Sequence, residues 1–377
     1  MNSVYLDNAA TTPMLPEVID VMQQSMQTNF GNPSSTHQYG RKAKAAIETA
    51  RKNIAKYFNV TASEIIFTAG GTEADNLILY NAVLNLGVKR IITSQIEHHA
   101  VLNTVKFLEK TYNIQVDYVG VGRNGAIDLN SLEVLLGKTE EKTLVSLMYV
   151  NNEIGNLLPI EEVSSLCQQY KAYFHSDTVQ AIGHYTIDLQ KIPIDFIAAS
   201  AHKFHGPKGV GFAYFKKGIG IQPILHGGEQ EKGARSSTEN VHSIIGMEKA
   251  LTIAYEDLEK DTAYITDLKK YFVEKLRELI VDIQFNGESS EKTSYTILNV
   301  RFPVENKMLL FNLDLQGVAV SGGSACQSGS NKGSHVLSAF LNKEDSEKTS
   351  VRFSFSKLNS KGEIDFTFQQ LKKILSL

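Results

Sequence analysis

Seven short apolar segments, separated by polar and helical sequence, constrain the fold of this chain more than any other feature. Each segment is apolar throughout, which is typical of strands buried on both faces of a mainly parallel sheet covered by helices. A helix is predicted from Gly40 onward, where apolar residues recur at intervals of three and four. The predicted strands cover residues 64–68, 90–93, 116–121, 143–150, 173–175, 196–199 and 210–215.

The chain has 377 residues, and its character changes after a long helix predicted at 250–280, so we expect two domains. The larger, at 16–250, is expected to bind a cofactor and to contain the seven-stranded sheet. Residues 1–15 and 251–377 are expected to form a smaller α+β domain, with strands at 295–301 and 351–356, that carries a mobile cysteine loop. The fold class is therefore α/β.

Composition narrows the class of partner. A formal net charge of -3 with 21% charged residues disfavours nucleic acid or an anionic membrane surface. The sequence shows no leader pattern and no run near the roughly 18 apolar residues of a membrane span, so we expect a cytoplasmic protein. With only Cys167 and Cys326, a disulfide framework and a paired-cysteine zinc site are excluded, and we expect no metal.

Two polar residues at the ends of predicted strands suggest a carbonyl cofactor. Lys203 follows the apolar segment 196–199 and precedes a glycine-rich turn, where desolvation can lower the pKa of an amine that attacks carbonyls. Asp177 follows an earlier strand and could hold a protonated ring nitrogen, although a helix N-cap is the alternative interpretation. Parallel strands would bring both residues to one sheet edge, where α/β sheets bind ligands.

A glycine turn predicts an anion site near them. Gly70 and Gly71 follow a predicted strand and open a helix, so backbone N–H groups and the positive helix end would face a phosphate, with Thr72 adding a hydroxyl. The alternative is an ordinary strand-to-helix turn. The chain thus presents a phosphate-binding turn, then an aspartate, then a lysine. This order is expected for a cofactor that is held at its phosphate, its ring nitrogen and its aldehyde.

A glycine- and serine-rich segment at 321–334 predicts a loop with Cys326 near its middle. A cysteine on an exposed loop is more plausibly retained as a nucleophile, whereas Cys167, in a predicted helix, fits a buried inert thiol. His98 could stack on a flat ring and move protons near neutral pH, or could be a solvated loop residue.

Taken together, these segments resemble the cysteine desulfurase family. Its members are pyridoxal 5'-phosphate enzymes of fold type I and are similar to class-V aminotransferases. The Ser-Ala-Cys surroundings of Cys326 resemble the long-loop subgroup. Matching segments run along essentially the whole chain, at residues 5–13, 32–37, 68–76, 97–98, 151–155, 175–180, 200–211, 235–240, 321–334 and 351–354. Ser237 departs from the pattern, because it stands where the family has a glycine.

The resemblance implies a role for each matching residue. Lys203 would bind the cofactor aldehyde, and Thr238 would reach the phosphate of the neighbouring subunit of a homodimer. The implied catalytic residues are Lys203, Cys326 and His98. The implied cofactor-binding residues are Gly71, Thr72, His98, Asn152, Asp177, Val179, Gln180, Ser200, His202, Lys203 and Thr238. The implied substrate-binding residues are Asn32, Asn152 and Arg352.

The implied reaction converts L-cysteine to L-alanine through a persulfide on Cys326. The sulfur would pass to an acceptor protein, such as an iron-sulfur scaffold or a tRNA-thiolation enzyme. A selenocysteine lyase or an aminotransferase of the same superfamily would use Lys203 and Asp177 in the same way, and a non-catalytic assembly scaffold is the alternative from another class.

Overall fold

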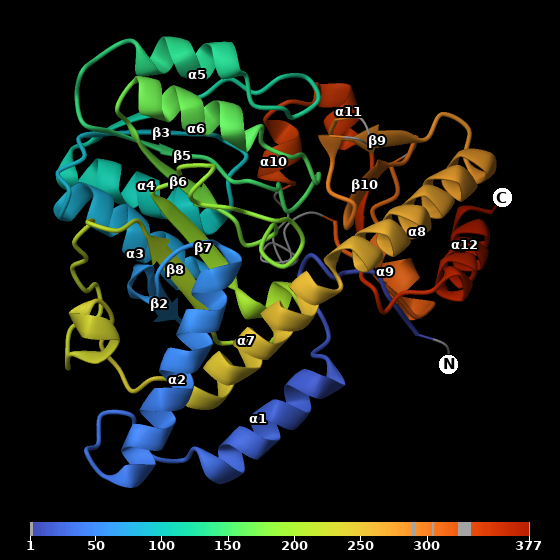
Figure 1. Cartoon of the computed structure of the whole chain (residues 1–377). Coiled ribbons are helices and arrows are strands. Elements are labelled where there is room, and N and C mark those ends of the chain that lie inside the picture. Colours follow the sequence, from blue (N-terminus) through green and yellow to red (C-terminus); the bar gives the residue numbers. More distant parts are fainter. Residues whose placement is uncertain (1–2, 289–291, 304, 323–332, 377) are drawn as a thin grey trace.

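The computed structural model describes residues 3–288, 292–303, 305–322 and 333–376, so Cys326 lies outside the described residues (Figure 1). A seven-stranded sheet forms the centre, in the order β2-β8-β7-β6-β5-β3-β4. Strand β8 runs antiparallel to both neighbours and the remaining pairs are parallel, which confirms the mainly parallel sheet. The strands are β2 (Ile65–Thr68), β3 (Arg90–Thr93), β4 (Gln115–Tyr118), β5 (Thr143–Ser146), β6 (Tyr173–Asp177), β7 (Phe196–Ser200) and β8 (Gly211–Phe215).

Helices cover both faces of this sheet because successive strand residues point to opposite sides. In β7, Ile197 and Ala199 join one apolar cluster, whereas Phe196 and Ala198 join another. The first cluster is completed by α2 (Gln38–Tyr57), α5 (Leu129–Leu136), α6 (Ile160–Gln169) and α7 (Val241–Glu256), with α1 (Pro16–Thr28) packed on α7. The second is completed by α3 (Gly71–Leu84) and α4 (His99–Tyr112).

A separate apolar cluster joins the two ends of the chain. Strand β1 (Val4–Tyr5) pairs in parallel with β11 (Val318–Ala319), and Val4 and Leu6 pack against C-terminal helices. A three-stranded antiparallel sheet, in the order β12-β10-β9, lies beside them at the right of Figure 1. This part contains α8 (Leu258–Leu279), β9 (Gln284–Asn286), β10 (Ile297–Arg301), α9 (Leu309–Leu315), α10 (His335–Ser338), α11 (Lys343–Glu347), β12 (Ser350–Ser354) and α12 (Lys361–Leu375).

Several local boundaries differ from the predicted ones. The single helix predicted at 250–280 is two helices, α7 and α8, which are interrupted at Asp257 (φ -95°, ψ 3°). Each helix buries its apolar side in a different cluster, and one continuous helix would have to serve both. The strand predicted at 173–175 extends to Asp177, which places that side chain at the end of β6. Among the described residues, no helix is both long and apolar enough to cross a membrane.

Candidate active site

A cavity of about 890 Å³ opens where β6 and β7 end. Its volume falls within the range of ligand pockets, about 300 to 1,000 Å³. The lining combines the N-terminal segment, the turn before α3, the ends of β6 and β7, and one residue of β12. The predicted site residues found in this lining are Gly71, Thr72, His98, Asn152, Asp177, Val179, Gln180, Ser200, His202, Lys203 and Arg352.

Lys203 ends the short 3-10 turn η2 (Ala201–Lys203) that follows β7. Its Nζ atom donates hydrogen bonds to the carbonyl oxygens of Ala9 at 2.7 Å and Ala10 at 2.9 Å. Gln180 also donates to the Ala9 carbonyl, at 2.9 Å. The N-terminal segment therefore holds the lysine amine at the cavity wall, although about 190 residues separate the two in sequence.

Asp177 lies 5% exposed at the end of β6, and its Oδ1 accepts a hydrogen bond from the backbone N–H of Val179 at 2.9 Å. Residues 179–184 form turns, so the helix N-cap interpretation is wrong. Burial raises the pKa of Asp177, while His98, the Val179 amide and Lys203 oppose that rise. A cation against this carboxyl group favours its charged form, so Asp177 is suited to hold a protonated ring nitrogen.

His98 is the N-cap of α4, where its Nδ1 accepts a hydrogen bond from the backbone N–H of Ala100 at 3.1 Å. Because Nδ1 is an acceptor there, the neutral ring carries its proton on Nε2. Burial lowers the pKa of His98, against the attraction of Asp177. His98 therefore presents a neutral ring to the cavity.

The turn before α3 forms a cradle for an anion. A Cβ atom at Gly71 would lie 2.5 Å from Cγ2 of Val179, so a glycine is needed for this close approach. The first N–H groups of a helix lack partners within it and attract anions. His202 also lines the cavity, and burial, followed by the charges of Lys203 and Lys208, lowers its pKa to about 4. This donor set, next to an amine and an acid, fits a flat aldehyde cofactor that carries a phosphate.

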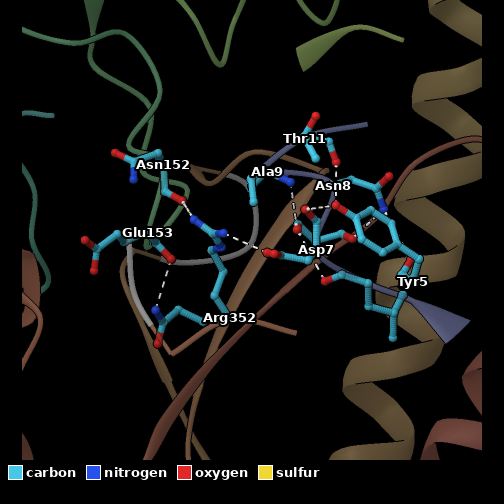
Figure 2. A network of polar contacts seen from close by, with 12 residues as sticks. Tyr5, Asp7, Asn8, Ala9, Thr11, Asn152, Glu153 and Arg352 are labelled. Carbon is cyan, nitrogen blue, oxygen red and sulfur yellow. Dashed lines mark hydrogen bonds and ion pairs between the residues drawn. The ribbon is translucent and has the colours of Figure 1, made fainter. Parts of the chain in front are cut away.

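Arg352 lies on β12, lines the cavity and is 1% exposed. Figure 2 shows its guanidinium between Asp7 and the backbone of Asn152. Its Nη2 pairs with Oδ1 of Asp7 at 2.8 Å, and its Nη1 donates to the carbonyl oxygen of Asn152 at 2.8 Å. Nε has no hydrogen-bond partner among the described residues. A planar guanidinium held in this way is suited to bind a substrate carboxylate.

Two predicted site residues are not brought together with the rest. Asn32 and Thr238 are exposed, and the lining that the described residues form includes neither of them. Cys326 lies outside the described residues. The residues on either side of that segment are placed: Ser321 pairs with Arg352 through its backbone, and Ser334 donates to Glu153.

Sequence reasoning missed several buried charged groups near the cavity. Asp75, 1% exposed, follows Thr72 by three positions in α3, and burial raises its pKa well above the ordinary value. It lies 3.4 Å from Nε2 of His175, and burial lowers the pKa of that ring to about 3. One turn further along α3, Ile78 and Leu79 are buried and apolar, so an acid on this side of the helix was a signal that could have been used. Asp7 carried no such local signal.

Known proteins match this chain over almost its entire length. The family model described as Aminotransferase class-V matches residues 4–366. A cysteine desulfurase IscS from Dictyoglomus turgidum is 43% identical over 375 residues, covering 99% of this chain and 94% of the relative. A putative cysteine desulfurase IscS 1 from Bacillus subtilis is 41% identical over 369 residues, covering 97% and 96% respectively.

Solved structures agree with these matches. A NifS-like protein superposes with a TM-score of 0.92 at 36% identity, covering both chains completely. A structure described as SspA in complex with cysteine has a TM-score of 0.82 at 30% identity, covering 95% of this chain and 100% of that one. Pyridoxal phosphate is the cofactor of this family, and the amine, acid, ring and anion cradle described above fit it. On the full-length match and the shared fold, the chain belongs to the cysteine desulfurase family of class-V aminotransferases.

Proposed function

We propose that this protein converts L-cysteine to L-alanine and retains the sulfur as a persulfide on Cys326. The observation that carries the proposal is that one cavity of about 890 Å³ is lined by Lys203, Asp177, His98 and Arg352 beside the glycine turn. An amine, an acid, a neutral ring and a guanidinium in one cavity are what a pyridoxal phosphate enzyme needs to bind an amino acid.

The cofactor would be held at three points. The turn at Gly71 and Thr72, with Ser200 and His202, would bind the phosphate, because all four line the cavity and the side chain of Ser200 lies beside the turn. Asp177 would accept the hydrogen bond of the ring nitrogen, and Lys203 Nζ would bind the aldehyde. When bound, pyridoxal phosphate supplies an electron sink conjugated to the substrate α-carbon.

The remaining residues of the cavity would handle the substrate. Arg352 would bind the cysteine carboxylate, and Asn152, whose carbonyl already accepts from Arg352, would lie beside it. Lys203 Nζ would accept the proton from the α-carbon and later return it to the product. The thiolate of Cys326 would form a bond to the substrate sulfur as the carbon–sulfur bond breaks. The electron pair of that bond would pass to the β-carbon, which takes up the proton lost by the Cys326 thiol, so that alanine and a persulfide result.

The two cysteines provide a matched test. Cys326→Ala is expected to abolish sulfide release from L-cysteine while keeping the cofactor absorbance near about 420 nm, where a protonated Schiff base absorbs. Cys167→Ala, which alters a buried thiol of α6, is expected to keep both properties. After exposure of the protein to cysteine, mass spectrometry should detect one added sulfur on the Cys326 peptide only. Sulfide release by Cys326→Ala at the wild-type rate would contradict the persulfide mechanism.

We also propose a cytoplasmic homodimer with shared sites, which supplies sulfur to an acceptor such as an iron-sulfur scaffold or a tRNA-thiolation enzyme. The exposure of Thr238, away from the cavity of its own chain, supports a contact with the partner's phosphate. A reducing cytoplasm would keep the Cys326 thiol free. If sites are shared, mixing and refolding inactive Lys203→Ala and Thr238→Val proteins should restore activity, because one site of each mixed dimer is intact. A monomer in light scattering would contradict the shared site.

A further inference from the structure

A histidine lies against the backbone of Lys203 rather than in the lining of the cavity. His184 comes from the turns that follow β6, and its Nε2 lies 3.2 Å from the carbonyl oxygen of Lys203. Its Nδ1 lies 3.1 Å from the hydroxyl oxygen of Tyr295, which precedes β10. Both ring nitrogens are therefore engaged, one by the lysine and one by the smaller C-terminal part of the molecule.

The partners of His184 determine its tautomer. A carbonyl oxygen can only accept, so the contact with Lys203 requires a proton on Nε2. Burial lowers the pKa of His184, which favours the neutral ring, and Nδ1 is then an acceptor. The hydroxyl of Tyr295 donates to Nδ1, and the structure also places this hydroxyl within 3.3 Å of the carbonyl oxygen of His184. Hydrogen bonds thus run from Tyr295 through His184 to Lys203.

The backbone is shaped for this approach. Gly183, which precedes the histidine, has a φ of +81°, a conformation that glycine adopts readily. A Cβ atom at this position would lie 2.7 Å from Cβ of Phe204, the residue that follows Lys203. The close packing of the His184 turn on the lysine turn therefore depends on a glycine. At the other end, Tyr295 belongs to the apolar cluster of α8, β10 and α12.

We propose that His184, held by Tyr295, is a positioning residue that fixes the backbone of Lys203 and so the placement of its amine. This inference rests on the proposed role of Lys203. A hydrogen bond to the Lys203 carbonyl restrains the peptide unit with which the chain leaves η2, and with it the direction of the lysine side chain. Displacement of a reacting group by about 1 Å can cost on the order of 100-fold in rate.

The test compares three variants of the holoenzyme. His184→Leu removes both ring nitrogens, His184→Gln keeps an N–H donor that can reach the Lys203 carbonyl, and Tyr295→Phe removes only the hydroxyl. For His184→Leu we expect kcat to fall about tenfold or more, with KM for L-cysteine changed less than about threefold, because Arg352 is untouched. His184→Gln should recover most of kcat, and Tyr295→Phe should be intermediate. Tyr185→Phe is the matched control, because its ring centroid lies 5.7 Å from that of Tyr295 and the substitution leaves both ring nitrogens of His184 in place.

A second readout does not depend on turnover. In coenzyme-free protein, the rate of reductive methylation at Lys203, followed by peptide mass spectrometry, reports the placement and reactivity of the amine. We expect this rate to change in His184→Leu at Lys203 alone among the lysines, and to return toward wild type in His184→Gln.

Wild-type rates in His184→Leu by both measurements would overturn the proposal. It would also fail if His184→Gln were as defective as His184→Leu, because the N–H donor would then be irrelevant. A wild-type protein that binds no pyridoxal phosphate would refute the proposed function instead, and the methylation rates would still test the positioning of Lys203.

Discussion

The ion pair between Asp7 and Arg352 offers a quantitative test of the substrate site (Figure 2). Asp7→Asn keeps an oxygen that can accept from Nη2 of Arg352 but removes the negative charge. In the free protein, the guanidinium is almost fully buried and would lose its paired anion. We expect the free energy of unfolding to fall by about 2 kcal/mol, below the usual 3 to 5 kcal/mol for breaking a buried pair, because the hydrogen bond remains.

Although Asp7→Asn should lower the stability, it should strengthen the binding of a substrate carboxylate to Arg352. Two carboxylates on one guanidinium lie roughly 6 Å apart, and they repel by about 3 kcal/mol at an effective dielectric constant of about 20. Since the Asp7 side chain is 17% exposed, solvent screens part of this repulsion. A remaining effect of about 1 to 2 kcal/mol corresponds to roughly 5- to 30-fold tighter binding of an amino acid in Asp7→Asn.

The assay titrates the holoenzyme with L-alanine and follows the cofactor spectrum, while thermal unfolding measures the stability of each protein. Ethylamine, which has the amine but lacks the carboxylate, is the control ligand and should bind both proteins equally. Weaker binding of L-alanine by Asp7→Asn, with ethylamine unchanged, would refute the reasoning. Asp7 would then be needed to orient Arg352 rather than compete for it.

Four further predictions concern the stability and reactivity of the fold. Arg51 and Glu231 form a buried pair with contacts of 2.6 and 2.7 Å. Arg51→Met and Glu231→Gln should each lower the free energy of unfolding, measured in urea, by about 3 to 5 kcal/mol, because each leaves a buried group without its partner. The double variant removes both groups and should lose less than the sum of the two. Burial raises the pKa of Glu97 from 4.5 to about 8, so the folded chain retains a proton that the unfolded chain loses. Stability should therefore decrease as the pH rises from about 4.5 to about 8, and Glu97→Gln should flatten this dependence in urea titrations. Burial raises the pKa of the Cys167 thiol, so iodoacetamide should label it only after unfolding, as peptide masses would show. Ser237 has a φ of +121°, a conformation that is strained for any residue other than glycine. Ser237→Gly should therefore raise the free energy of unfolding by about 1 kcal/mol. An unchanged midpoint of urea unfolding would contradict this strain.

The sequence alone predicted the sheet, because strands that are buried on both faces appear in the sequence as short apolar segments. Each of the seven apolar segments became a strand, and the helix from Gly40 onward became α2, whose apolar stripe includes Ile47 and Ile54. Strand ends and turns are also local, so Lys203, Asp177 and the Gly71 turn could be assigned to one sheet edge before any coordinates. What the pattern missed was where strands stop: within the segment 143–150 the strand ends at Ser146, and the backbone N–H of Met148 bonds to Glu97.

Only the tertiary structure decided which distant groups meet. Asp7 and Arg352 are 345 positions apart, and their pairing follows from β1 docking beside β11 while Asp7 bridges to Ser354. Likewise, α7 and α8 are separate helices that meet at Asp257, because their buried sides pack into two different apolar clusters. Periodicity reports whether a residue is buried and in which local conformation. It does not report which other element covers that residue, because that choice depends on the packing of the whole chain.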